Sequence, residues 1–417
     1  MARWRCARSS PLDRPVVAWS PVETEARRAY GRLVALLASR SGDLAEAEDA
    51  LADALLAALE RWPATGIPAN PQGWLLTVAR RRSIDRARRR AHADLAQAEL
   101  VRMQEEAEAA MNEDAAYPDQ RLGLLLACSH PAIDAGARTP LMLQAVLGLT
   151  AERMAPAFLV SAAAMTKRLV RAKAKLIGAG VRFETPDPEE LADRLEPVLD
   201  AVYAAFTLSR GGEGDNSLQH EALWLGRLLA ELAPGEPEAS GLLALMLFVS
   251  ARPSPIQAGH YIPVSRQDPA SWDATSMIEA EQCLRQASRL GRLGRFQLEA
   301  AIQAVHADRR RHPATNWTAI LDLYNGLLAI APTIGSHVSR AAALAQSGLP
   351  LAAIQALDAL DPGLIKAHQP YWATRAFALA AAGVQAEAAD AYTRAAGLAE
   401  HPAIRTWLLS QRAQHSN

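Results

Sequence analysis

The chain has 417 residues, of which 50% are apolar, 21% charged and 5% aromatic, and its formal net charge is −1. This length predicts two or three domains, and the composition excludes collagen-like, low-complexity and disordered chains. No uncharged apolar stretch is long enough to span a membrane, and the arginine-rich start lacks the apolar core of a signal peptide, so we expect a cytoplasmic protein with no membrane partner.

The small net charge hides a strong alternation along the chain. Residues 1–92 carry 16 basic and 10 acidic side chains, and residues 121–182 carry nine basic and two acidic. Residues 93–120 carry one basic and eight acidic side chains, and residues 183–417 carry 18 basic and 25 acidic. Two basic blocks around an acidic connector, followed by an acidic tail, predict two modules that bind a polyanion.

Apolar residues recur at helical spacing in nearly every segment, which predicts an all-α fold. Asp43 and Glu46 form a capping-box pattern, and Asn70 followed by Pro71 is typical of a helix start. We expect helices over residues 43–62, 70–91, 140–148, from 150 and over 161–177, with further helices beyond 186.

The helix expected over residues 43–62 has two different faces. Its apolar face carries Leu51, Leu55, Ala58 and Trp62, and its opposite face carries Glu46, Asp49, Asp53 and Glu60. The acidic face is either an ordinary solvated surface or a docking surface for a basic partner.

The helix expected over residues 70–91 is unusually rich in arginine. Residues 80–90 include seven arginines and one acid, Asp85, so cations surround the second half of the helix. Guanidinium groups suit phosphate geometry, which favours a nucleic-acid surface over a solvated arginine run. Trp74 is either part of the core or a wall against unstacked bases.

Residues 149–177 predict a helix-turn-helix. A short helix and a tight turn precede a helix that Ser161 caps, and the second helix of such a motif enters the major groove. Its expected inward stripe is Met165, Leu169, Ala172 and Leu176, and its cationic stripe is Lys167, Arg168, Arg171 and Lys175. An ordinary pair of capped amphipathic helices is the alternative.

Several stretches in this order resemble a known family. Residues 47–51, residues 74–85 and the helix-turn-helix ending at Lys173 are similar to the two conserved regions of extracytoplasmic-function sigma factors of bacterial RNA polymerase. Farther along, the chain resembles the subgroup with a long tetratricopeptide-like extension, in residues 228–232, 241–247, 267–273 and 296–302. The resemblance implies sigma region 2 over 1–92, an acidic linker over 93–118, sigma region 4 over 119–183 and the extension over 184–417.

The resemblance also implies a partner for each surface. The acidic helix would bind the largest subunit of core RNA polymerase through Glu46, Glu48, Asp49 and Asp53. The arginine helix would bind the −10 element and its opened single strand through Trp74, Thr77, Arg80, Arg81, Asp85, Arg88 and Arg89. Region 4 would contact the second-largest subunit and bind the double-stranded −35 element through Ser161, Thr166, Lys167, Arg168, Arg171 and Lys175. The linker would follow the RNA path, and the C-terminal extension would contact the sigma regions and regulate them.

The extension contains a weak internal repeat. Gly348, Ala353, Leu357 and Leu360 match Gly383, Ala388, Tyr392 and Ala395 at a spacing of 35 residues. This spacing is close to the tetratricopeptide period of about 34 residues and predicts a superhelical stack with a groove. The stack would regulate the protein or bind a partner, or it would serve as a scaffold.

No pattern in the sequence predicts catalysis, a cofactor or a metal site. The glycine-rich residues 211–214 follow no strand and so indicate a turn, and Cys128 near His130 favours a buried thiol over a catalytic dyad. The three cysteines are far apart, and no histidines have metal-ligand spacing. A helix-turn-helix repressor with a ligand- or peptide-binding tetratricopeptide domain is the alternative function, but it leaves the acidic and arginine helices unexplained.

Overall fold

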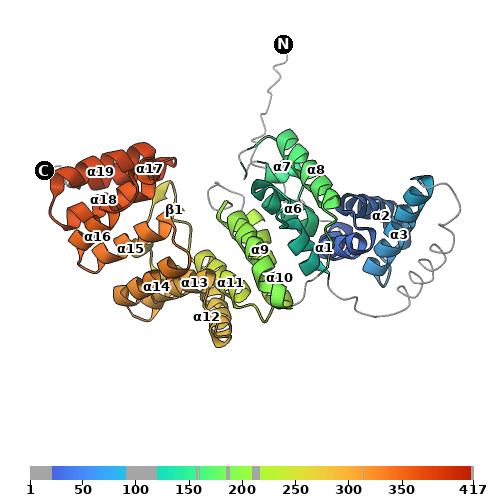
Figure 1. Ribbon diagram of the computed structural model, residues 1–417, viewed down its shortest axis with the longest axis horizontal. Coiled ribbons are helices and arrows are strands. Elements are labelled where there is room, and N and C mark those ends of the chain that lie inside the picture. Colours follow the sequence, from blue (N-terminus) through green and yellow to red (C-terminus); the bar gives the residue numbers. More distant parts are fainter. Residues whose placement is uncertain are drawn as a thin grey trace, which may run out of the picture. The chain divides into compact units, whose positions relative to one another are not determined.

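The computed structural model describes residues 21–90, 120–155, 158, 160–184, 188–208, 217–312 and 314–414. This part of the chain is helical apart from one short hairpin (Figure 1), which confirms the expected all-α fold. The chain forms two compact units, Met1–Gly214 and Asp215–Asn417. None of the described helices has the length and apolar character needed to cross a membrane. The expected linker over 93–118 and the turn over 211–214 lie outside the described residues.

In the first unit, helices from both sides of the linker share one packed body. Helices α1, α2 and α3 pack against one another, α1 also packs on α5 and α6, and α9 packs on the same two helices. The first unit therefore includes α9, beyond the expected domain end at residue 183. Its described helices are α1 (Pro21–Ser41), α2 (Leu44–Thr65), α3 (Pro71–Arg90), α5 (Arg121–Cys128), α6 (Ala135–Leu147), α7 (Ala151–Met154), α8 (Ala162–Gly178) and α9 (Pro188–Leu208).

Side-chain caps begin α2 and α3 where the sequence patterns predict them. The backbone N–H of Glu46 donates to Oδ1 of Asp43 at 3.1 Å, and the N–H of Gly73 donates to Oδ1 of Asn70 at 2.8 Å. These bonds satisfy N–H groups that have no partner inside the helix. Helix α2 continues three residues beyond its expected end at Trp62.

A close backbone approach joins α1 to α6. A Cβ atom on Gly31 would lie 2.3 Å from the carbonyl oxygen of Val146, so only glycine fits there without moving a helix. Gly148 ends α6 at φ 66°, and the ring of Tyr30 packs beside it. The contact therefore depends on the lack of a side chain at residue 31.

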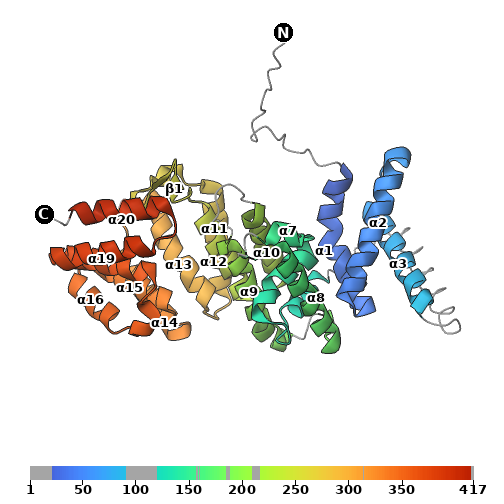
Figure 2. The same ribbon diagram turned by 90° about the horizontal axis from the view of Figure 1, so that it is seen from above.

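The second unit is a succession of helices that pack on their neighbours in the chain (Figure 2). Its first half contains α10 (Ser217–Leu232), α11 (Pro237–Ser250), β1 (Ile256–Gln257), β2 (His260–Tyr261), η2 (Val264–Arg266), η3 (Pro269–Ser271), α12 (Ala274–Arg289), α13 (Arg295–Ala307) and η4 (Asp308–Arg310). Its second half contains α14 (Trp317–Ile330), α15 (Ile334–Gln346), α16 (Pro350–Asp358), α17 (Pro362–Ile365), α18 (Gln369–Ala381), α19 (Gln385–Leu398) and α20 (Pro402–Gln414).

The hairpin β1–β2 is antiparallel and pairs Ile256 with Tyr261. Its turn places Ala258 at φ 47° and Gly259 at φ 76°. Strands of two residues are too short to show alternation, so the sequence did not predict them. The last helix, α20, packs on β2, where the rings of Tyr261 and Trp407 meet edge to face with centroids 5.2 Å apart.

The predicted internal repeat corresponds to two equivalent turns. Gly348 joins α15 to α16 at φ 81°, and Gly383 joins α18 to α19 at φ 82°. In both turns the N–H after the glycine donates to the carbonyl four residues before the glycine at 3.0 Å. A positive φ favours glycine, which explains why the repeat preserves it.

Candidate nucleic-acid interface

Helix α3 exposes only part of its arginine run. Arg81 and Arg82 are exposed, whereas Arg80 is 3% exposed and Thr77 is 5% exposed. The hydroxyl of Thr77 donates to the carbonyl oxygen of Gly73 in the preceding turn at 2.9 Å. Among the residues predicted to bind the −10 element, Arg81 is therefore accessible, and Thr77 and Arg80 are not.

The burial of Thr77 and Arg80 differs from our expectation that both face DNA, and it has a packing cause. Leu76 and Ala79 are buried where α3 packs on α2. Residues three or four positions apart share a helix face, so Arg80 lies on the side of Leu76. The side chains of the other predicted residues, Asp85, Arg88 and Arg89, lie outside the described part of α3.

Trp74 belongs in part to the core of the first unit. Its half-buried ring meets the buried ring of Trp62 edge to face, with centroids 5.4 Å apart and planes at 63°. This geometry is favourable for aromatic pairs. The pair joins the start of α3 to the end of α2.

The acidic face of α2, defined here as Glu46, Asp49 and Asp53, lies at the surface of the first unit. Asp49 is exposed, and Glu46 and Asp53 are half-buried. A carboxylate group on a helix surface has little desolvation cost. This face therefore keeps the accessibility that docking on a basic surface requires.

Glu48 differs from the acidic face because it points inward. It forms an ion pair with Lys173 of α8, and the side chains of Glu48 and Lys173 are 11% and 14% exposed. Burial raises the pKa of Glu48 although Lys173 opposes the shift. The residue predicted to bind polymerase is thus held by α8 of its own chain.

No sequence pattern could reveal this ion pair, because its members are 125 residues apart. The pair has a further neighbour in Cys128, which is fully buried at the end of α5. Burial, and next the charge of Glu48, raise the pKa of the Cys128 thiol, whereas Lys173 lowers it. Cys128 therefore belongs to the interior of the first unit, as the sequence favoured.

Helix α8 has the two faces that its sequence predicts. The expected inward residues Met165, Leu169, Ala172 and Leu176 are its buried residues. The hydroxyl of Ser161 caps the helix by accepting the N–H of Ala164 at 3.2 Å. Ser161, Thr166, Lys167, Arg171 and Lys175 are exposed, and Arg168 is half-buried. Helix α7, the first helix of the predicted helix-turn-helix, has four residues.

Two of the cations on α8 contact the start of α6. Nη1 of Arg168 donates to the carbonyl oxygen of Gly136 at 3.2 Å. This carbonyl loses its helical donor because Pro140, four residues later, has no N–H. Nζ of Lys175 donates to Asp134 at 2.9 Å, and this hydrogen bond lowers the pKa of the Asp134 carboxyl.

The arginine helix and the acidic helix fall within one conserved region. Residues 26–93 match the family model of sigma-70 region 2. Residues 26–93 are therefore a sigma-70 region 2 domain. Region 2 of a sigma-70 factor binds core RNA polymerase and promoter DNA, so this domain supports a role in promoter recognition.

The remaining comparisons name no activity for this chain. Residues 194–288, from α9 to α12, match a family of unknown function, DUF6596. An uncharacterized protein of Rhizobium meliloti (strain 1021) is 36% identical over 376 residues, which cover 88% of this chain and 89% of the relative. No solved structure matches the chain.

Proposed function

We propose that this protein is an extracytoplasmic-function sigma factor that directs core RNA polymerase to promoters with −10 and −35 elements. The observation that carries the proposal is the region 2 match over residues 26–93, because it covers both the acidic face of α2 and the arginine run of α3. A repressor has no need for the acidic face.

Core binding uses the acidic face of α2, which meets basic helices of the largest subunit. Asp49, the exposed member, makes the first contact, with Glu46 and Asp53 beside it. Complementary charge speeds such encounters and makes them sensitive to salt. Glu48 joins this surface only after its ion pair with Lys173 breaks.

Promoter binding uses the two exposed cationic surfaces of the first unit. Arg81 and Arg82 of α3 hold phosphates of the −10 element while its bases unpair. Lys167 and Arg171 of α8 enter the major groove at the −35 element, where long cationic side chains reach guanine edges.

The second unit, a tetratricopeptide-like extension in this proposal, regulates the first. The second unit is nearly neutral, with 16 basic and 17 acidic side chains in residues 215–417, because the acidic excess of residues 183–417 lies mostly before Asp215. Because the unit is tethered, it competes with DNA at an effective concentration on the order of millimolar for a short flexible link. Truncation after Gly214 tests this claim, since the first unit ends there. Unchanged core binding and transcript yield in the truncated protein would contradict it.

The proposed function is tested by transcription with purified core polymerase. We expect the full chain to initiate at its own promoter only when core is added. Charge reversal of the acidic face, Asp49→Lys with Asp53→Lys, should abolish co-purification with core at moderate salt. The matched control is Glu196→Lys on an exposed position of α9, which should leave core binding intact. DNA binding without core, together with no effect of the charge reversal, would favour the repressor.

A further inference from the structure

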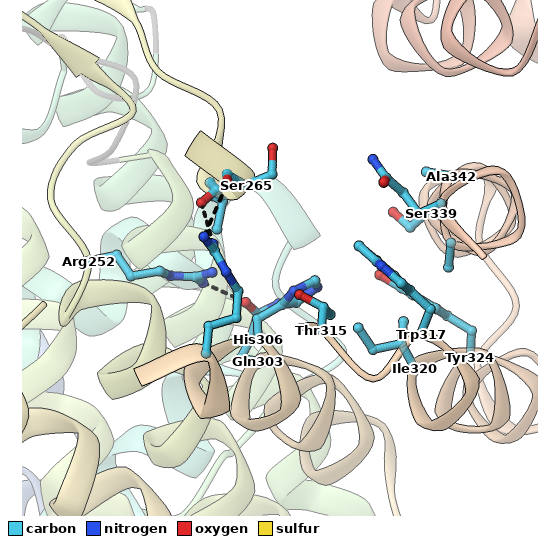
Figure 3. Close-up of a pocket in the computed structure, with 14 residues that line it drawn as sticks. Arg252, Ser265, Gln303, His306, Thr315, Trp317, Ile320, Tyr324, Ser339 and Ala342 are labelled. Carbon is cyan, nitrogen blue, oxygen red and sulfur yellow. Dashed lines mark hydrogen bonds between the residues drawn. The ribbon is translucent and has the colours of Figure 1, made fainter. Parts of the chain in front are cut away.

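The second unit contains a cavity of about 410 Å³ between α13, α14, α15 and the turns η2 and η4 (Figure 3). This volume lies in the range of pockets that hold small organic molecules. Its walls extend from Arg252, just after α11, to Gln346 at the end of α15. The cavity therefore exists only when these helices are assembled.

One wall of the cavity is cationic and firmly held. Nη1 of Arg309 donates to the carbonyl oxygen of Val264 at 2.8 Å, and its Nη2 donates to the carbonyl of Ser265 at 3.1 Å. Nη2 of Arg252 donates to the side-chain oxygen of Gln303. The partners of Arg309 are neutral backbone carbonyls, so they fix its guanidinium group without cancelling its positive charge.

The two guanidinium groups share an aromatic support. Their central carbons lie 5.9 Å (Arg252) and 5.7 Å (Arg309) from the centroid of Trp272, whose side chain is buried. An indole face stabilises a nearby cation and leaves its charge in place. Two positive charges are thus set in position before any ligand arrives, which reduces the ordering cost of binding.

No carboxylate group belongs to the fourteen residues that line the cavity. The nearest acid in sequence, Asp308, pairs with Arg311 at 3.7 Å and with His312 at 2.8 Å. Partly buried cations are stabilised by an opposite charge. An anionic group placed in the cavity would supply it for Arg309, whose hydrogen-bond partners are neutral carbonyls.

His306 adds a neutral polar group to the cationic wall. Burial, followed by the charges of Arg252 and Arg309, lowers the pKa of His306 to about 4. At neutral pH its ring therefore offers one N–H donor and one acceptor and adds no further charge. The ring also meets that of Trp317 edge to face, with centroids 5.6 Å apart.

The opposite side of the cavity is mainly apolar on α14, and on α15 it also includes the polar side chains of Ser339 and Gln346. Figure 3 shows Trp317, Ile320 and Tyr324 on α14 and Ala342 on α15, across from Arg252 and His306. Indole, phenol and aliphatic groups pack well against a flat ring. The two sides differ in chemistry, so they would fix the orientation of a ligand that is charged at one end and apolar at the other.

We propose that this cavity binds a small organic carboxylate with a planar apolar body. The carboxylate lies beside Arg309 and Arg252, and the apolar body packs against Trp317 and Ile320. The proposal does not depend on the sigma factor function, because binding is measured on the full chain without polymerase or DNA.

The test is isothermal titration calorimetry of the full chain with benzoate, phenylacetate and indole-3-acetate, each compared with its neutral amide. We expect at least one acid to bind about tenfold or more tightly than its amide, because hydrogen bonds to a charged group are stronger. Inorganic phosphate is the second arm and should bind less tightly than that acid. Equal affinity of acid and amide, phosphate binding as tight as the acids, or no binding at millimolar ligand would overturn the proposal.

Two variants on opposite sides of the cavity locate the site. Arg309→Met removes the charge and keeps most of the side-chain volume, and Ala342→Phe fills the apolar side without touching the arginines. Each should weaken acid binding about tenfold or more, whereas Arg311→Met, at an exposed arginine outside the lining, should not. If Arg309→Met lowers the helical signal in circular dichroism, Ala342→Phe and the acid–amide comparison decide the question. Acid binding that persists in Ala342→Phe would place the ligand elsewhere and refute the assignment.

Discussion

Lys173→Met should open the contact between α2 and α8 within the first unit. Removing one member of a buried ion pair costs about 3–5 kcal/mol, because the other charge is left without a partner. Both side chains retain slight exposure. The raised pKa of Glu48 also makes it easier for the unpaired carboxylate to become neutral by taking up a proton. We therefore expect a loss of about 2–3 kcal/mol in the free energy of opening, below the full range.

Cys128 reports this opening because it is fully buried beside the ion pair. In a Cys6→Ser, Cys283→Ser background it is the single thiol, and its alkylation rate under native conditions follows the open population. A loss of about 2–3 kcal/mol corresponds to labelling that is roughly 30 to 150 times faster.

Two further variants make the measurement decisive. Glu48→Gln combined with Lys173→Met leaves no buried charge unpaired, so labelling should return most of the way to the original rate. Lys167→Met removes an exposed lysine of the same helix and should have no effect. Equal labelling rates in Lys173→Met and Lys167→Met would show that the ion pair does not hold this contact closed.

Three other predictions follow from single residues. Arg81→Ala should reduce permanganate reactivity of −10 thymines in the complex with core polymerase, because Arg81 is an exposed cation of α3; unchanged reactivity would remove it from the DNA surface. Gly31→Ala should destabilise the first unit by about 1–3 kcal/mol, since the new Cβ meets a backbone carbonyl; the urea midpoint measures this, with the unobstructed Gly178→Ala as the control. His306 has a folded-state pKa of about 4, below its unfolded value of 6.5, so its contribution to stability is complete above that value and is lost as pH falls. Between pH 8 and pH 5 this loss amounts to about 2 kcal/mol, and His306→Asn should lack this pH-dependent loss in urea unfolding.

The sequence predicted the features that depend on local pattern. The caps at Asp43 and Asn70 and the inward stripe of α8 follow from rules that act within one or two turns. It could not predict which polar residues another helix covers. Thr77 and Arg80 are buried by packing between helices. The identity of a charged residue does not indicate whether a residue far away in the chain will pair with it.

The start of α6, near Pro140, is a second feature that the sequence predicted wrongly. A proline favours the first turn of a helix, and so the sequence predicted a start at residue 140. The structure begins α6 at Ala135 and places Pro140 inside it. A side chain from α8, Arg168, supplies a donor to the carbonyl of Gly136 that the proline leaves without one. A tertiary contact thus makes a locally unfavourable position tolerable.

The contact between Tyr261 and Trp407 joins the last helix of the second unit to its early hairpin, so the unit is closed like a ring. A stack of helices that contact only their neighbours behaves like a spring, because bending and twisting spread along its length. Here the last helix is fastened to an early hairpin, so stretching must first detach α20 from β2. The hairpin is followed at once by η2, whose backbone carbonyls hold Arg309. Tension applied at the C-terminal helix therefore reaches the cationic wall of the cavity through the hairpin as well as through α19, on which α20 also packs.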